Sequence, residues 1–208
     1  MGVNGTRPES GRRAFDIAGG VALLVLASPL LLAGALAVLL SSGRPVFFGH
    51  WRIGLRGRPF RCWKLRTMDV GAEKHLEKDP DLKELHRSNG YKLPNGVDPR
   101  VTPVGRLLRR TYIDELPQLW NVLMGDMSLL GPRPVQVEQL DHFRPHEDEL
   151  LSVRPGLFGA WTCLGRSRPP YPERIHLELE YVRNRTWKTD AAILVRSVRA
   201  VLEGQADR

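Results

Sequence analysis

A long apolar segment near the N-terminus dominates the hydropathy pattern of the chain. No charged residue lies between Ile17 and Leu40. As a helix this segment would be about 36 Å long, enough to cross the hydrocarbon core of a bilayer, which is about 30 Å thick. A signal peptide is the alternative, but the segment is long for a signal core and Ser41-Ser42-Gly43-Arg44 is a poor cleavage context. The pattern therefore predicts a membrane helix.

The middle of this segment and its flanks argue against a straight crossing. Pro29 removes the hydrogen bond to the Val25 carbonyl and should kink the helix, and the Ser28 hydroxyl can bond back to a nearby carbonyl. The positive-inside rule cannot be satisfied across a membrane when both flanks are basic. We therefore expect a re-entrant helix hairpin, broken at Ser28-Pro29, with both ends in the cytosol; a straight span is the alternative. The basic flanks are Arg7, Arg12 and Arg13 before the segment, and Arg44, Arg52, Arg56, Arg58 and Arg61 after it.

The remaining pattern predicts a small β-hairpin and several helices. Strand-like runs at 45–48 and 60–65 flank a turn rich in glycine and proline. From Val104 to Arg110, apolar and basic residues fall on opposite sides of a short amphipathic helix, which can lie on a membrane surface. The expected fold class is α+β and mostly helical, with amphipathic interfacial helices around the site described below. Further helices are expected at 73–88, 172–185 and 188–202, with a broken helix at 136–152.

These elements divide the chain into four parts. We expect a flexible N-terminus at 1–13, the re-entrant membrane helix at 14–42, a cytosolic domain at 43–203 and a tail at 204–208.

The net charge of the chain indicates which classes of binding partner to expect. Lys plus Arg total 31 and Asp plus Glu total 23, so the net charge is +8 and the chain suits polyanions such as anionic lipid head groups or phosphorylated substrates. No phosphate-binding glycine loop and no basic motif interleaved with aromatic residues is present, so we expect no nucleic-acid partner. The two cysteines, Cys62 and Cys163, form neither a disulfide framework nor a zinc motif.

Two adjacent carboxylates are the strongest candidates for chemistry. Asp114 and Glu115 open an apolar-periodic helical segment, in which Pro117 is tolerated in the first turn. The helix dipole and a preceding run of arginines favour the ionised acids, which can then act as nucleophile or metal ligand. The alternative is that Asp114 is an ordinary helix N-cap. The arginines are Arg106, Arg109 and Arg110.

Several basic residues are candidates for binding phosphate. Lys64 and Arg66 are two residues apart and would project from the same side of a strand; a solvated basic edge is the alternative. Arg133 stands between two prolines that fix its backbone, which suits bidentate phosphate binding, although a turn would use the same prolines. Arg154 begins another rigid basic turn, and Arg166 lies in a basic stretch before Pro169-Pro170.

Taken in order, these motifs resemble a known family. Asp114-Glu115-Leu116-Pro117-Gln118-Leu119 is followed by a run from Gly125 to Pro134 that contains Gly131-Pro132-Arg133-Pro134. Around them lie Ser28-Pro29, Lys64-Leu65-Arg66-Thr67-Met68 and Arg154-Pro155-Gly156. This arrangement, over about residues 12–203, resembles the bacterial sugar transferases, the monotopic polyprenyl-phosphate phosphoglycosyl transferases, in their minimal catalytic form.

The resemblance implies an activity and roles for these residues. A sugar 1-phosphate would pass from a UDP-sugar to a polyprenyl (undecaprenyl) phosphate by a ping-pong mechanism, with release of UMP. Asp114 matches the nucleophile and would contact Mg²⁺, and Glu115 matches the second acid. Lys64, Arg109 and Arg133 match positions near phosphate or nucleotide. The enzyme would be a monotopic protein on the cytosolic face of the inner membrane, upstream of other glycosyltransferases in glycoconjugate or exopolysaccharide synthesis.

One stretch departs from the family pattern. The residues from Trp161 to Arg166 replace a run that resembles Gln-Val-Asn-Gly-Arg in many members, so the identity of the sugar stays open. A different class of protein also fits the charge and the apolar segment, namely a basic membrane adaptor without catalysis. That alternative leaves the acid pair among arginines unexplained.

Overall fold

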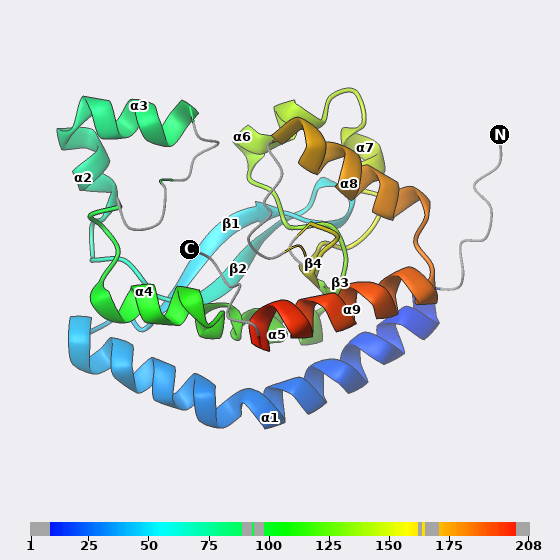
Figure 1. Cartoon of the computed structure of the whole chain (residues 1–208), viewed down its shortest axis with the longest axis horizontal. Coiled ribbons are helices and arrows are strands. Elements are labelled where there is room, and N and C mark those ends of the chain that lie inside the picture. Colours follow the sequence, from blue (N-terminus) through cyan, green and yellow to red (C-terminus); the bar gives the residue numbers. More distant parts are fainter. Residues whose placement is uncertain (1–8, 89–92, 94–97, 162–163, 165–170, 203–208) are drawn as a thin grey trace.

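The computed structural model describes residues 9–88, 93, 98–161, 164 and 171–202. One long helix, α1 (Glu9–Ser42), runs along one side of the molecule, and the other described elements lie on the opposite side of it (Figure 1). Those elements, in chain order, are β1 (Phe47–Ile53), the 3₁₀ turn η1 (Leu55–Gly57), β2 (Pro59–Leu65), α2 (Glu73–Lys78), α3 (Pro80–Ser88), α4 (Pro103–Arg110), the 3₁₀ turn η2 (Ile113–Glu115), α5 (Gln118–Met124), β3 (Ser128–Leu130), α6 (Val137–Leu140), the 3₁₀ turn η3 (Asp141–Phe143), α7 (Glu147–Leu150), β4 (Gly156–Phe158), α8 (Tyr171–Arg183) and α9 (Trp187–Leu202).

The predicted α+β class is confirmed: the protein is mostly helical, with a small β-hairpin and a long apolar helix at the N-terminus, whereas the interfacial role of its helices stays a prediction. The helix expected at 73–88 is two helices, α2 and α3, because Pro80 begins a new helix after Asp79. The N-terminal part expected at 1–13 overlaps α1, which already begins at Glu9. Residues 1–8 and the tail 204–208 lie outside the described residues.

The apolar segment forms one continuous bent helix, and its re-entry into the membrane stays a prediction. Pro29 lies inside α1, and the helix bends near its middle (Figure 1). Ser28 Oγ donates to the Val25 carbonyl oxygen at 2.8 Å, so the predicted back-bond is confirmed and satisfies the acceptor that Pro29 cannot reach. Among the described residues, Ser10–Ser42 is the one stretch long and apolar enough to cross a membrane, by length and composition.

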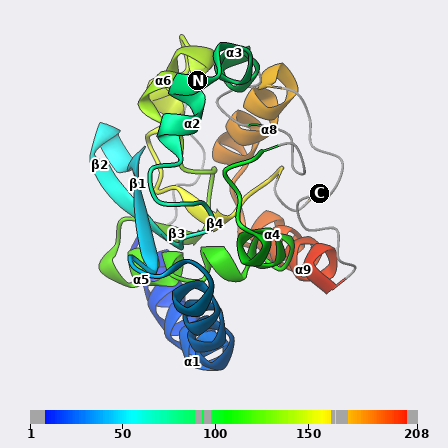
Figure 2. The ribbon, with the colours of Figure 1, turned by 90° about the vertical axis from the view of Figure 1, so that its left-hand side faces the viewer.

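A layer formed mainly by α4 and α5 packs against α1, as Figures 1 and 2 show, and strands β2 and β3 also contact this helix. The C-terminal arm of α1 packs into a cluster in which Val38, 1% exposed, contacts Leu65 of β2 and Leu108 of α4. Large apolar side chains stay exposed along the middle of α1 and on α4 and α5: Val25, Leu26, Leu30, Leu32, Leu107, Trp120 and Met124.

Two small sheets connect this layer to the other half of the protein. Strands β1 and β2 form the antiparallel hairpin, whereas β3 and β4 pair in parallel. Gly131, which follows β3, and Gly156, the first residue of β4, allow the backbone to approach closely, because a Cβ on Gly156 would lie 2.0 Å from the Gly131 nitrogen. The main core gathers Phe60 and Cys62 of β2 with residues of α5, β3, α8 and α9.

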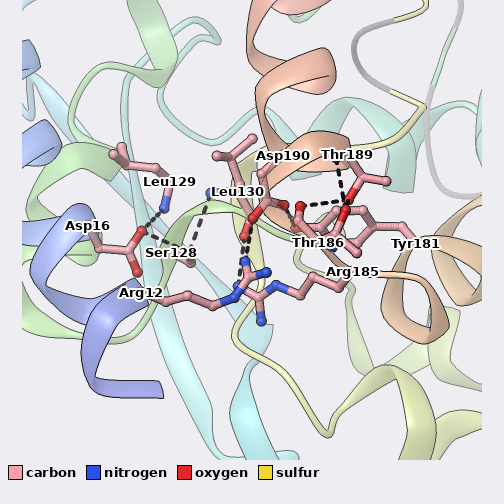
Figure 3. A network of polar contacts seen from close by, with 10 residues as sticks. All are labelled: Arg12, Asp16, Ser128, Leu129, Leu130, Tyr181, Arg185, Thr186, Thr189 and Asp190. Atoms are coloured by element: carbon pink, nitrogen blue, oxygen red, sulfur yellow. Dashed lines mark hydrogen bonds and ion pairs between the residues drawn. The ribbon is translucent and has the colours of Figure 1, made fainter. Parts of the chain in front are cut away.

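Polar contacts fasten the N-terminal arm of α1 to β3 and α9, as Figure 3 shows. The buried Asp16 carboxylate accepts hydrogen bonds from Ser128 Oγ and from the Leu129 amide, each at 2.8 Å. Arg12 forms an ion pair with Asp190 of α9, and the Asp190 carboxylate also accepts from the Tyr181 hydroxyl at 2.7 Å. Because both arms of α1 are held, the helix is an integral part of the domain.

Candidate active site

The acid pair lies in η2, the 3₁₀ turn between α4 and α5. Tyr112 enters this turn in the left-handed region, with φ at 57°, and its carbonyl accepts from the Glu115 amide at 3.0 Å. The sequence predicts that the acids open the following helix. In the structure α5 begins only at Gln118, with Pro117 as its cap residue, so the acids stand just before the helix.

Cations from two other elements converge on Glu115. Lys64 of β2 places its Nζ 2.5 Å from Glu115 Oε1, and Arg133, which follows β3, places Nη2 2.8 Å from the same oxygen. The structure thus brings together three residues that the sequence analysis singled out. Among the described residues, no side chain or amide forms a hydrogen bond with the Asp114 carboxylate, although this side chain is only 5% exposed. The cations therefore pair with Glu115, whereas the Asp114 carboxylate has no hydrogen bond or ion pair among the described residues.

The pKa values of the two acids are shifted in opposite directions. Burial tends to raise the pKa of Glu115, but Arg133 and Lys64 outweigh it and hold this pKa well below its usual range. For Asp114 burial dominates: together with the negative charge of Glu115 it raises the pKa to about 6, against the attraction of Lys64, Arg109 and Arg133. The prediction that both acids have environments favouring ionisation is therefore wrong for Asp114, because the sequence does not reveal its burial.

Of the three arginines that precede the acids, two are exposed to solvent and one is half-buried. Arg106 and Arg110 are exposed on α4. Arg109 is half-buried, and its Nε donates to Thr67 Oγ1 at 2.9 Å. Gly105 lets α4 lie against this segment, since a Cβ there would stand 2.1 Å from the Thr67 carbonyl oxygen. The predicted place of Arg109 near the acid pair fits its electrostatic effect on Asp114.

Strand alternation predicts that Arg66 projects from the same side as Lys64. In the structure Arg66 instead points away from the acid pair. Its Nη2 donates to the Ser42 and Gly43 carbonyls at 2.6 and 2.9 Å, and its Nη1 donates to the Arg44 carbonyl at 3.2 Å. Strand β2 ends at Leu65, so the alternation does not extend to Arg66. Arg66 therefore binds the C-terminal end of α1.

Arg154 has no hydrogen bond or ion pair with either acid among the described residues. Arg154 Nε donates to the Gly125 carbonyl at 3.0 Å, and the side chain helps to line a small cavity with Arg12, Asp16, Ser128 and Arg185. Arg166 lies outside the described residues.

Glu178 and Asn121 support the site, and the sequence analysis missed both. Glu178 of α8 is 2% exposed, and its Oε1 accepts from the Arg133 amide at 2.9 Å. Asn121 of α5 bridges to β2: its Oδ1 accepts from the Trp63 amide at 3.0 Å and its Nδ2 donates to the Arg61 carbonyl at 2.7 Å. No local motif marks either residue, because each acts on a segment distant in sequence.

Comparison with known proteins identifies the family. Residues 8–204 match the family described as bacterial sugar transferase. The chain belongs to this family of transferases. The resemblance drawn from the sequence motifs is thereby confirmed.

Named relatives in the bacterial sugar transferase family include both longer and similar-sized proteins. The undecaprenyl-phosphate galactose phosphotransferase of Salmonella typhimurium is 39% identical over 195 residues, which cover 92% of this chain and 40% of the relative. The UDP-galactose-lipid carrier transferase of Erwinia amylovora is 37% identical, over 92% of this chain and 40% of that protein. The exopolysaccharide production protein ExoY of Rhizobium meliloti is 40% identical, over 94% of this chain and 88% of that protein. This chain thus spans about two fifths of the first two and most of the third.

The magnesium ion that the family resemblance implies fits the donor set at the acid pair. Mg²⁺ prefers oxygen ligands and is usually held by one or two carboxylates together with substrate phosphates, so it does not need a cage of protein side chains. The described residues contain no cluster of three or more His, Cys, Asp and Glu side chains. Asp114, which has no hydrogen-bonding partner among the described residues, is the ligand that we expect.

Proposed function

We propose that the protein transfers a sugar 1-phosphate from a UDP-sugar to polyprenyl (undecaprenyl) phosphate, giving polyprenyl-diphosphate-sugar and UMP. The observation that carries this proposal is the convergence of Lys64 and Arg133 on Glu115, next to an Asp114 carboxylate that has no hydrogen-bonding partner among the described residues. The names of the relatives support the substrate classes, since they mention undecaprenyl phosphate, UDP-galactose and a lipid carrier.

In the first step Asp114 acts as the nucleophile. One of its carboxylate oxygens attacks the β-phosphorus of the UDP-sugar, and the bond from that phosphorus to the oxygen bridging the two phosphates breaks. UMP leaves with the bonding electron pair, and the sugar phosphate remains on Asp114 as an acyl phosphate. With a pKa of about 6, Asp114 is mostly ionised at neutral pH and remains a better nucleophile than a strongly stabilised carboxylate would be.

In the second step the lipid phosphate takes the sugar phosphate. An oxygen of polyprenyl phosphate attacks the same phosphorus, the bond to the Asp114 oxygen breaks, and the carboxylate is regenerated. This sequence is the ping-pong mechanism, with one covalent intermediate.

The cations beside Glu115 offset the charge that the substrates bring. A carboxylate that attacks an anionic diphosphate meets like-charge repulsion, and fixed positive groups reduce this barrier. Glu115 stays ionised and holds Lys64 and Arg133 in place through one oxygen. Mg²⁺, held by Asp114, would supply further positive charge to the diphosphate.

The position of α1 supports a monotopic arrangement on the cytosolic face of the inner membrane. Both arms of α1 pack on the same domain, while Val25, Leu26 and Leu32 near its middle are 67–76% exposed. We propose that this bent helix enters one leaflet and returns, with the break at Ser28-Pro29 as its deepest part. The exposed apolar residues of α4 and α5 would lie at the interface, next to anionic head groups.

A place in a pathway follows from the product. A sugar on a lipid diphosphate is a substrate for further glycosyltransferases, and one relative is named for exopolysaccharide production. We therefore place the reaction at the first membrane step of glycoconjugate or exopolysaccharide synthesis.

UMP release from a panel of UDP-sugars, beginning with UDP-galactose, tests the proposal directly. The full chain is purified in detergent and assayed with Mg²⁺ in the presence and absence of undecaprenyl phosphate. We expect sustained release that needs the lipid, for one or two sugars. Asp114→Asn should lower it at least about 10³-fold, as loss of a nucleophile does. Asp148→Asn, which changes an exposed acid on α7, is the matched control and should leave it unchanged.

The outcome separates the transferase from the membrane adaptor. If folded protein releases no UMP with any sugar, transferase activity is not supported and the adaptor becomes the better interpretation. If Asp114→Asn releases UMP at the wild-type rate, Asp114 is not the nucleophile.

A further inference from the structure

The segment that carries Arg133 has a single amide donor at its centre. Proline lacks an N–H group, so within Pro132-Arg133-Pro134 only Arg133 can donate a backbone hydrogen bond. That amide donates to Glu178 Oε1 at 2.9 Å. The neighbouring residues form hydrogen bonds with other backbone groups. The Gly156 amide donates to the Pro132 carbonyl at 2.8 Å, and the Ile53 amide donates to the Val135 carbonyl at 2.9 Å. At Arg133 itself, a side chain from α8 provides the contact.

Glu178 is connected to the acid pair through one residue. The Arg133 backbone rests on Glu178, and the Arg133 guanidinium reaches Glu115 Oε1 at 2.8 Å. No hydrogen bond or ion pair joins Glu178 to Asp114 or Glu115, so the polar contacts connect Glu178 with the acid pair through Arg133. A shift of this backbone would move the guanidinium relative to both acids.

The hydrogen bond from the Arg133 amide does not require Glu178 to be ionised. The charged groups that face it are Arg133 and, from its own helix, Arg174, whose guanidinium stacks on the Trp161 ring at 4.0 Å. Burial raises the pKa of Glu178 to about 7, while the Arg133 amide, Trp161 and the two arginines act in the opposite direction. A carboxyl oxygen accepts a hydrogen bond whether or not the group is protonated. A neutral side chain of the same shape can therefore replace it.

We propose that Glu178 is a positioning residue for the sugar-phosphate transfer, which holds the Arg133 guanidinium at the acid pair by binding the Arg133 amide. The inference rests on the function proposed above. It assigns to α8, distant in sequence from the acids, a share in placing the cation that meets the phosphates. The expected cost of losing this contact is large, because a displacement of about 1 Å at a reacting centre can reduce the rate about 100-fold.

A double-mutant cycle with Arg133 distinguishes positioning from general stabilisation. We expect Glu178→Met to lower kcat/KM for UMP release about 30-fold, and Glu178→Gln, which keeps the acceptor, to stay within about threefold of wild type. In an Arg133→Ala background, Glu178→Met should lower kcat/KM by less than about a further twofold, since there is no guanidinium left to position. An equal loss in both backgrounds, or an equal loss for Gln and Met, would overturn the proposal.

Hydrogen exchange of the wild-type protein tests the contact without any variant and without activity. A peptide that covers 131–135 carries amides only at Gly131, Arg133 and Val135. We expect slow exchange at Arg133. Exchange at the rate of an unstructured chain would show that Glu178 does not hold this amide. Absence of UMP release from the wild type would instead contradict the proposed function, so the two failures can be told apart.

Discussion

At the scale of single residues, Glu178 couples protonation to folding. Its pKa is about 7 in the folded protein, against an ordinary value of 4.5 that applies to the unfolded chain. Below about pH 4.5 the group is protonated in both states. As the pH rises through 7, the folded protein has to ionise a buried carboxyl group. The stability that the neutral carboxyl provides is therefore complete below pH 4.5 and is lost as the pH rises through the folded-state pKa.

Glu178→Gln should remove this pH dependence. Relative to the variant, we expect wild-type stability to fall between pH 5 and pH 8, by up to roughly 3 kcal/mol, the free energy that corresponds to the pKa difference. Thermal melts of the two proteins across this range measure the effect. Glu180→Gln, at an exposed position on the same helix, is the control and should track the wild type. A constant difference between wild type and Glu178→Gln would mean that Glu178 does not titrate in this range.

At the scale of elements, Asn121 fixes how α5 and β2 meet. The side chain is 1% exposed and forms hydrogen bonds with the backbone at Trp63 and Arg61, next to Lys64 on the same strand. The contact therefore sets the distance between the strand that carries Lys64 and the helix that follows the acid pair.

Asn121→Leu should destabilise the protein and misplace Lys64. The variant leaves the Trp63 amide and the Arg61 carbonyl without their partner, which should cost about 3 kcal/mol in the free energy of unfolding. Denaturant unfolding in detergent measures this, and Asn184→Leu, at an exposed position, should change stability by less than about 0.5 kcal/mol. Equal stability of the Asn121 and Asn184 variants would show that the bridge contributes little.

Local signals in the sequence located the central residues of the site but not their supports. Asp114, Glu115 and Arg133 stand in short motifs, and Lys64 lies within the predicted strand β2. Arg66 was misplaced because β2 ends one residue earlier. Glu178 lies on a helix in which acids alternate with apolar residues, a pattern that is typical of a solvated face. Only the three-dimensional packing shows that this acid is buried against a backbone amide.

At the scale of the whole molecule, α1 is held by the domain at both ends. Its N-terminal arm binds β3 through Asp16 and α9 through Arg12, and its C-terminal end is capped by Arg66. A helix that crossed the bilayer would carry one of its ends to the opposite side and would lose one of these sets of contacts. We therefore predict that both arms stay with the domain, on one side of the membrane, and that the exposed middle enters the lipid.

Cysteine labelling of cells tests this topology. Single cysteines at Ser10 and Arg56, both exposed, report the two flanks of α1 in a background in which Cys163 is changed to serine. We expect a membrane-impermeant maleimide to label Ser10→Cys and Arg56→Cys only after the cytoplasmic membrane is opened. The buried Cys62 is the internal control, because it should react only after denaturation. If one flank is labelled in intact spheroplasts and the other is not, α1 crosses the bilayer, and the anchors at one of its ends have to be broken in the cell. If both stay protected until the membrane is opened, both flanks lie on the cytosolic side, which is the topology that allows the contacts of Asp16 and Arg66 to hold at the same time.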